Sequence, residues 1–150
     1  MLGNGGTHDG RRKAIKLIAA TLATLISLTS CQTFRHQFAQ PEVNWQAKIG
    51  QLQYQGPKTS LIGEVLVRFS KSGDFELTFT KGPGVTLIMV RQDATFARVE
   101  GPLARGRWAG PVEQAPRRFR GWLALRNVLM QTQKPALKHS IGSETFVFQF

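Results

Sequence analysis

The strongest constraint on the fold is the stretch DFELTFT at residues 74–80, in which polar and apolar residues alternate without exception. Phe75, Leu77 and Phe79 therefore fall on one side of an extended chain, and the polar residues fall on the other. A helix could not gather these three side chains, because its faces repeat about every 3.6 residues. The stretch predicts a half-buried β-strand.

Short runs rich in β-branched and aromatic residues continue on both sides of this strand, and turn sequences such as GPKTS, KSGD and KGPG separate them. Such closely spaced strands run antiparallel, so the pattern predicts a mostly β fold built as an antiparallel meander. The predicted strands are residues 45–54, 61–69, 74–80, 85–91, 94–100, 103–110 and 144–150.

One segment, residues 115–131, has a helical period instead. Its large apolar residues recur at steps of three or four, from Phe119 through Trp122 to Leu129. Pro116 suits the first helical turn, and Gly121 weakens the middle slightly. We predict one amphipathic helix here, followed by a loop over residues 132–143.

The amino-terminal part of the chain has the pattern of a secretory signal. Basic residues between positions 11 and 16 precede an apolar run from Leu17 to Leu28. The run is about a dozen residues long, whereas a helix needs about 20 to span a bilayer. We therefore predict a cleaved signal peptide over residues 1–30 rather than a transmembrane helix.

The only cysteine, Cys31, follows this run directly. Residues 28–31, LTSC, resemble the lipobox of bacterial lipoproteins. The resemblance implies cleavage between Ser30 and Cys31 and acylation of Cys31. Several acyl chains on one residue would anchor firmly, since each buried methylene contributes about 0.8 kcal/mol. The alternative is an ordinary secretory signal with a chance cysteine beside its cleavage site.

The residues after Cys31 indicate a location and a domain plan. In bacteria where the sorting rule is best defined, Asp after the lipidated Cys retains a lipoprotein in the inner membrane, so Gln32 implies the outer membrane, facing the periplasm. Residues 31–43 include Pro41 and lack a clear period, which predicts a tether. Residues 44–150 suffice for one small β domain.

The charge balance points to anionic partners. Four of the twenty basic residues and one of the nine acidic ones lie in residues 1–30, so the formal net charge of +11 falls to +8 in the processed chain. A lipid-anchored exported protein meets no genome, so we predict phospholipid or lipopolysaccharide head groups as partners rather than nucleic acid.

Arginines are concentrated in one part of the sequence, with aromatic residues among them. They either form a basic surface that rests on anionic head groups, or belong to a helix whose aromatics pack on the sheet while its arginines are solvated. The residues predicted to contact anionic membrane are Arg105, Arg107, Arg117, Arg118 and Arg120, with Arg126 nearby.

The sequence contains no GxSxG, HExxH, Walker or GxGxxG motif, and its lone cysteine and three histidines offer no metal-ligand cluster. We therefore predict no enzymatic activity, no cofactor and no metal. Asp74 and Glu76 could suggest a carboxylate pair, but their alternation is more typical of a solvated strand face. His139 is predicted to be a surface residue in a loop.

Three stretches, WQAKIGQL, DFELTFTKGPGVTLIMV and APRRFRGWLAL, resemble the LolA/LolB-like family of lipoprotein carriers, over about residues 45–126. The resemblance implies an unclosed half-barrel, packed against a helix, whose apolar face binds lipid or lipoprotein acyl chains. It also implies a role in outer-membrane lipoprotein localisation, with a periplasmic carrier protein as a possible partner. The implied cavity residues are Trp45, Phe75, Leu77, Phe79, Leu87, Met89 and Trp122.

Other interpretations stay open. A structural or interaction lipoprotein of the cell envelope would have a filled core and no ligand cavity. The alternating phenylalanines at 146, 148 and 150 also resemble the last strand of an outer-membrane barrel, although the chain is short for one. The family's receptor carries an exposed Leu after Pro in one turn, where this chain has Gly84 and Val85, so we predict weak delivery of lipoproteins to a bilayer.

Overall fold

Strand pairing in the computed structural model runs from Gln46 to Gln149, and the structure describes residues 36–150. The predicted signal peptide, the cleavage site after Ser30 and the lipidation of Cys31 lie outside the described residues. Among residues 36–150, no helix is both long enough and apolar enough to span a bilayer.

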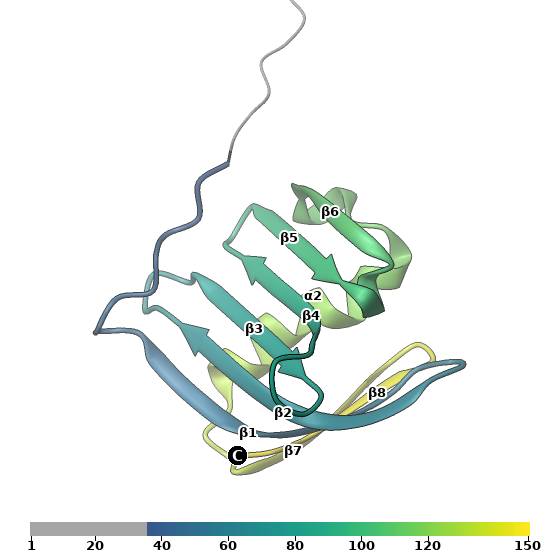
Figure 1. The fold of residues 1–150 in the computed structure, drawn as a ribbon. Helices are drawn as coiled ribbons and strands as arrows, with labels where there is room; N and C mark the ends of the chain where they lie inside the picture. The colour runs from purple at the N-terminus through teal and green to yellow at the C-terminus, as the bar shows by residue number, and fades with distance from the viewer. Residues whose placement is uncertain (1–35) are drawn as a thin grey trace, which may run out of the picture. The chain divides into compact units, whose positions relative to one another are not determined.

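Eight antiparallel strands form one open sheet (Figure 1). The first six follow one another as a meander, whereas β8 pairs with the free side of β1 and β7 lies outside β8. The ends of the sheet are β6 and β7, so the sheet is not closed, which confirms the predicted half-barrel. The strands are β1 (Gln46–Gln55), β2 (Ser60–Phe69), β3 (Phe75–Thr80), β4 (Thr86–Gln92), β5 (Phe96–Gly101), β6 (Gly106–Pro111), β7 (Ala136–Ile141) and β8 (Glu144–Gln149).

Within residues 36–150 the one α-helix, α2 (Arg117–Gln131), lies against a single face of the sheet, as predicted. Figure 1 shows it behind β3 and β4, on the side toward which β1, β8 and β7 curve. Its apolar stripe, including Trp122 and Leu125, is buried against the strands. Two short 3-10 turns, η1 (Pro102–Ala104) and η2 (Val112–Gln114), flank β6.

Alternation along the strands assigns side chains to two faces. Leu77 and Val90 are paired neighbours on the helix-covered face, and both are fully buried. Thr78 and Met89 are paired neighbours on the opposite face and are only half-buried. We call these the inner face, against α2, and the outer face.

The prediction of a loop over residues 132–143 is wrong, because Ala136–Ile141 forms strand β7. This strand pairs with β8 along its whole length, from Ala136 opposite Gln149 to Ile141 opposite Glu144. Its alternation is weak because His139 stands between Leu137 and Ile141, at a position where the pattern calls for an apolar residue. The final strand is confirmed, with Phe146 and Phe148 fully buried on the inner face.

Candidate functional site

The inner face gathers the largest group of apolar side chains, and four of the seven predicted cavity residues lie there: Phe75, Leu77, Phe79 and Trp122. Each is at most 2% exposed. The Trp122 ring, which comes from α2, lies 4.9 Å from the Tyr54 ring and 5.0 Å from the Phe146 ring between centroids. The side chains of α2 therefore occupy the space that an acyl chain would need on this face.

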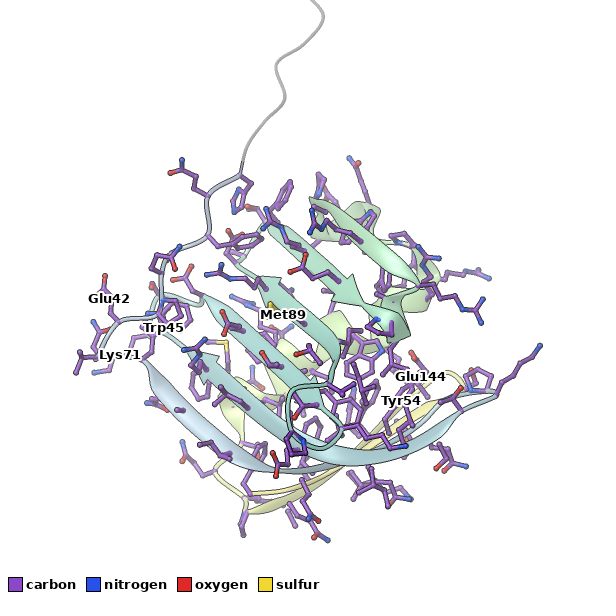
Figure 2. The ribbon with its side chains drawn as sticks, viewed as in Figure 1. Glu42, Trp45, Tyr54, Lys71, Met89 and Glu144 are labelled. Atoms are coloured by element: carbon purple, nitrogen blue, oxygen red, sulfur yellow. The ribbon has the colours of Figure 1, made fainter. Side chains whose placement is uncertain are left out.

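The other three predicted residues do not join this group. Met89 alternates with buried Ile88 and Val90, so it lies on the outer face of β4 (Figure 2). Trp45 comes just before β1 and is half-buried, far from Tyr54 in the same view. Leu87 is half-buried at the point where the β3–β4 register shifts. The seven predicted cavity residues therefore do not all lie on the inner face, because Met89 belongs to the outer face of β4.

An open depression of about 610 Å³ lies over β4, β5 and β6. It includes outer-face Met89 and the ion pair between Arg107 and Glu100, whose Nε and Oε2 atoms are 3.0 Å apart. It therefore differs in position and chemistry from the predicted apolar cavity. Its lining residues are Thr86, Met89, Glu100, Gly101, Gly106 and Arg107.

A polar pair that the sequence does not predict borders the inner core. The Tyr54 hydroxyl donates a hydrogen bond to Glu144 Oε1 over 2.7 Å, and Figure 2 shows these side chains together. Burial raises the pKa of Tyr54, and the Glu144 carboxylate adds to this. Burial likewise raises the pKa of Glu144. Gly121 lies so close to Glu144 that a Cβ at this position would require the carboxylate to shift.

Lys48 on β1 binds the carboxyl end of α2. Its ammonium donates to the carbonyl oxygens of Leu129 and Thr132 over 3.1 and 2.6 Å. A cation at this position offsets the partial negative charge of the helix end. Burial lowers the pKa of Lys48. Its even-numbered position, shared with Leu52 and Tyr54, is the sequence signal that places it on the inner face.

The five arginines predicted to meet a membrane, Arg105, Arg107, Arg117, Arg118 and Arg120, are all exposed. Arg107 lies opposite Glu100 on the outer face of the sheet, so the five do not share one face, and we call only Arg117, Arg118 and Arg120 the arginine surface. These three belong to the first helical turns of α2, whose first turn holds no acidic residue. Arg105 has a left-handed backbone, with φ of 51°. Arg126 differs from this set, because its Nε donates to the Gly73 carbonyl over 2.9 Å and is thereby part of the fold.

The prediction of a solvated polar face on β3 is wrong at Glu76, which is 7% exposed. Its carboxylate pairs with Arg68 on β2 and lies 3.4 Å from Arg91 Nε on β4. Asp74 instead accepts hydrogen bonds from Ser70 and Ser72 in the turn before β3. The two carboxylates thus serve different structural contacts and do not form a pair.

His139 lies on β7 rather than in a loop, and its Nε2 atom is buried without a hydrogen-bond partner among the described residues. Within residues 36–150, no group of three His, Cys, Asp or Glu side chains is arranged to hold a metal ion.

The turn between β3 and β4 is exposed over residues 81–86. Gly82 and Gly84 both have positive φ, 64° and 80°, so the backbone itself favours glycine at these positions. Val85 is 52% exposed at the end of the turn. The tip therefore offers little apolar area beyond that of Val85.

Residues 36–45, which we call the N-terminal arm, contact the outer face. His36 and Phe38 lie against Phe96 of β5, and the Ala39 carbonyl accepts a hydrogen bond from Arg91 of β4 over 3.2 Å. These contacts join residues more than fifty positions apart, so no local sequence pattern could have indicated them.

Comparison of the chain with protein-family models, with curated proteins and with solved structures finds no match.

Proposed function

We propose that this protein is a lipid-anchored component of the bacterial cell envelope whose arginine surface rests on anionic head groups. Acylated Cys31 would supply the anchor, and Gln32 favours the outer membrane as the location of the protein. Support for the anchor comes from the sequence around residues 11–31, which lies outside the described residues. Support for the contact with head groups comes from the fold.

The placement of arginines at the start of α2 carries this proposal. The amino end of a helix has a partial positive charge, so acidic residues are favourable there and basic residues are not. Arg117, Arg118 and Arg120 occupy this end without an acidic residue in the first turn, and Pro116 provides no side-chain cap. A bound layer of anionic phosphates would offset both the three charges and the helix end.

The test uses the full chain with Cys31→Ser, so that surface contact is measured without the anchor. We expect binding to vesicles containing anionic phospholipid, weaker binding as salt rises, and little binding to neutral vesicles. Arg117→Gln, Arg118→Gln and Arg120→Gln together should weaken binding about a hundredfold, since each basic residue near such a surface contributes about 1 kcal/mol.

The matched control removes the same charge elsewhere. Lys58 and Lys71, in turns, and Lys138, on β7, are exposed away from the start of α2, and changing all three to Gln should reduce vesicle binding much less. Equal losses of vesicle binding in the two triple variants would mean that net charge alone determines binding, and would contradict a defined contact surface.

Acyl-chain binding under α2 is the second candidate. It is favoured by one observation: the sheet is open, and a single helix lies over its apolar inner face. Because the buried inner side chains leave the described core filled, a chain could enter only if α2 moved away. Native mass spectrometry of the protein extracted from membranes should then detect a lipid beyond the one on Cys31. If no second lipid is detected while arginine-dependent vesicle binding is intact, acyl-chain binding is contradicted and only the first proposed function stands.

A further inference from the structure

The N-terminal arm is bound at its beginning by His36. The imidazole stacks on the Phe96 ring with 4.4 Å between centroids and an interplanar angle of 17°. Its Nε2 atom lies 2.5 Å from Asp93 Oδ2. The other oxygen of Asp93 accepts the backbone N–H groups of Thr95 and Phe96, both over 2.8 Å. These two hydrogen bonds come from the turn itself, so they hold the Asp93 carboxylate in position independently of the N-terminal arm.

Burial by itself would raise the pKa of Asp93, but the Thr95 and Phe96 N–H groups and His36 together lower it below its usual value. Asp93 is thus ionised at neutral pH and can accept a hydrogen bond or an ion pair from His36.

Phe38 provides the second contact. Its ring lies 5.5 Å from the Arg91 guanidinium and 5.6 Å from that of Arg98, distances at which cations attract an aromatic ring. Arg91 also donates to the Ala39 carbonyl and is itself held by Glu76. The outer face thus presents a preformed receptor for two alternate residues of the arm.

The arm does not become a ninth strand of the sheet. Residues 36–42 have no regular secondary structure, and Gln37, Ala39 and Gln40 are exposed. The attachment therefore consists of a few side-chain contacts, which can separate without breaking the sheet.

We propose that the N-terminal arm is a releasable strap that sets how far the domain extends from the membrane. The inference rests on the proposed lipid anchor at Cys31. His36 is five positions after Cys31, and five residue steps span at most about 18 Å when extended. If the arm is released as far as Gln46, fifteen residues span at most about 54 Å. Docking thus keeps the domain near the membrane, and release triples its maximum reach.

The experiment uses the full chain in lipid nanodiscs, after mass spectrometry has determined the modification of Cys31. Spin labels are placed on exposed Gln40 in the arm and exposed Gln53 on β1. We expect a narrow distance distribution between them. His36→Ala with Phe38→Ala should broaden it and raise the undocked fraction at least tenfold, whereas Gln37→Ala should leave it unchanged.

Energy transfer from a dye at Gln53 to a head-group dye reports height on the same samples. The double variant should show lower transfer than both the parent protein and Gln37→Ala. A broad distance distribution in the parent, or an unchanged one in the double variant, overturns the docked arm. Unchanged height with a released arm overturns the strap alone. If mass spectrometry finds no lipid on Cys31, the strap is overturned because the arm is not anchored, even when the distance distribution is narrow.

Discussion

The inner and outer faces alternate along the same strands, yet their side chains are held by different interactions. On the inner face, aromatic and aliphatic side chains pack against α2 and are almost fully buried. On the outer face, Glu76 joins Arg68 and Arg91, and the arm adds contacts between aromatic rings and guanidinium groups. Stability of the inner face should therefore depend on volume, and that of the outer face on charge.

The largest expected effect comes from the inner face. Trp122→Ala removes the ring that α2 packs against both Tyr54 and Phe146, and it should lower the free energy of unfolding by about 3–5 kcal/mol. Ile62→Ala, at an outer-face position that is 61% exposed, should change it by about 0.5 kcal/mol or less. Urea denaturation followed by circular dichroism measures both, and similar losses would remove the distinction between the faces.

A smaller loss is expected from the outer-face charges. Glu76→Gln leaves Arg68 and Arg91 without their shared carboxylate, and because these arginines are partly exposed we expect a loss of about 1–3 kcal/mol, less than for a fully buried pair. Glu100→Gln is the control, because its partner Arg107 is 76% exposed. That change should cost under about 1 kcal/mol. Denaturation at low and high salt measures the free energy of unfolding of both variants, and added salt should reduce the difference between them.

The smallest effect concerns the pH dependence of the inner face. The raised pKa of Glu144 means that the folded state favours its neutral form. Its contribution to stability is therefore fully present below the pH at which it titrates in the unfolded chain, and is lost as pH rises through its higher folded pKa. Glu144→Gln should abolish this dependence. Tyr54→Phe should move it to higher pH, because the Tyr54 hydrogen bond lowers the Glu144 pKa; a shift to lower pH would contradict this origin.

Local pattern was sufficient for most of the strands and the helix, because alternation and the helical period report which side of an element is buried. It failed at β7, where His139 occupies a position between Leu137 and Ile141 that alternation assigns to an apolar residue. It also failed for the cavity set. Residues 85–90 are apolar on both faces, so alternation could not separate Met89 from its inner-face neighbours.

The remaining site features depend on contacts that the sequence does not encode locally. Three such contacts each join separate elements of the chain. Glu144 lies close to Gly121, Lys48 donates a hydrogen bond at the end of α2, and His36 stacks on Phe96. The clustered arginines were predicted either to meet a membrane or to be solvated, and their exposure agrees with both alternatives. This prediction could not separate Arg126, whose partner is a backbone carbonyl on the β2–β3 turn.

The pairing of β1 with β8 has a consequence for the order in which the protein folds. Gln51 lies opposite Gln149, so the first strand meets a neighbour that is synthesised about a hundred residues later. Until that neighbour arrives, one side of β1 exposes unpaired N–H and C=O groups, which can pair with another unfinished chain. Contacts this distant in sequence also slow folding, because a long loop must close before they form. A chain that crosses a membrane from its amino end would thus complete its sheet only when its last residues emerge, and would need protection from aggregation until then.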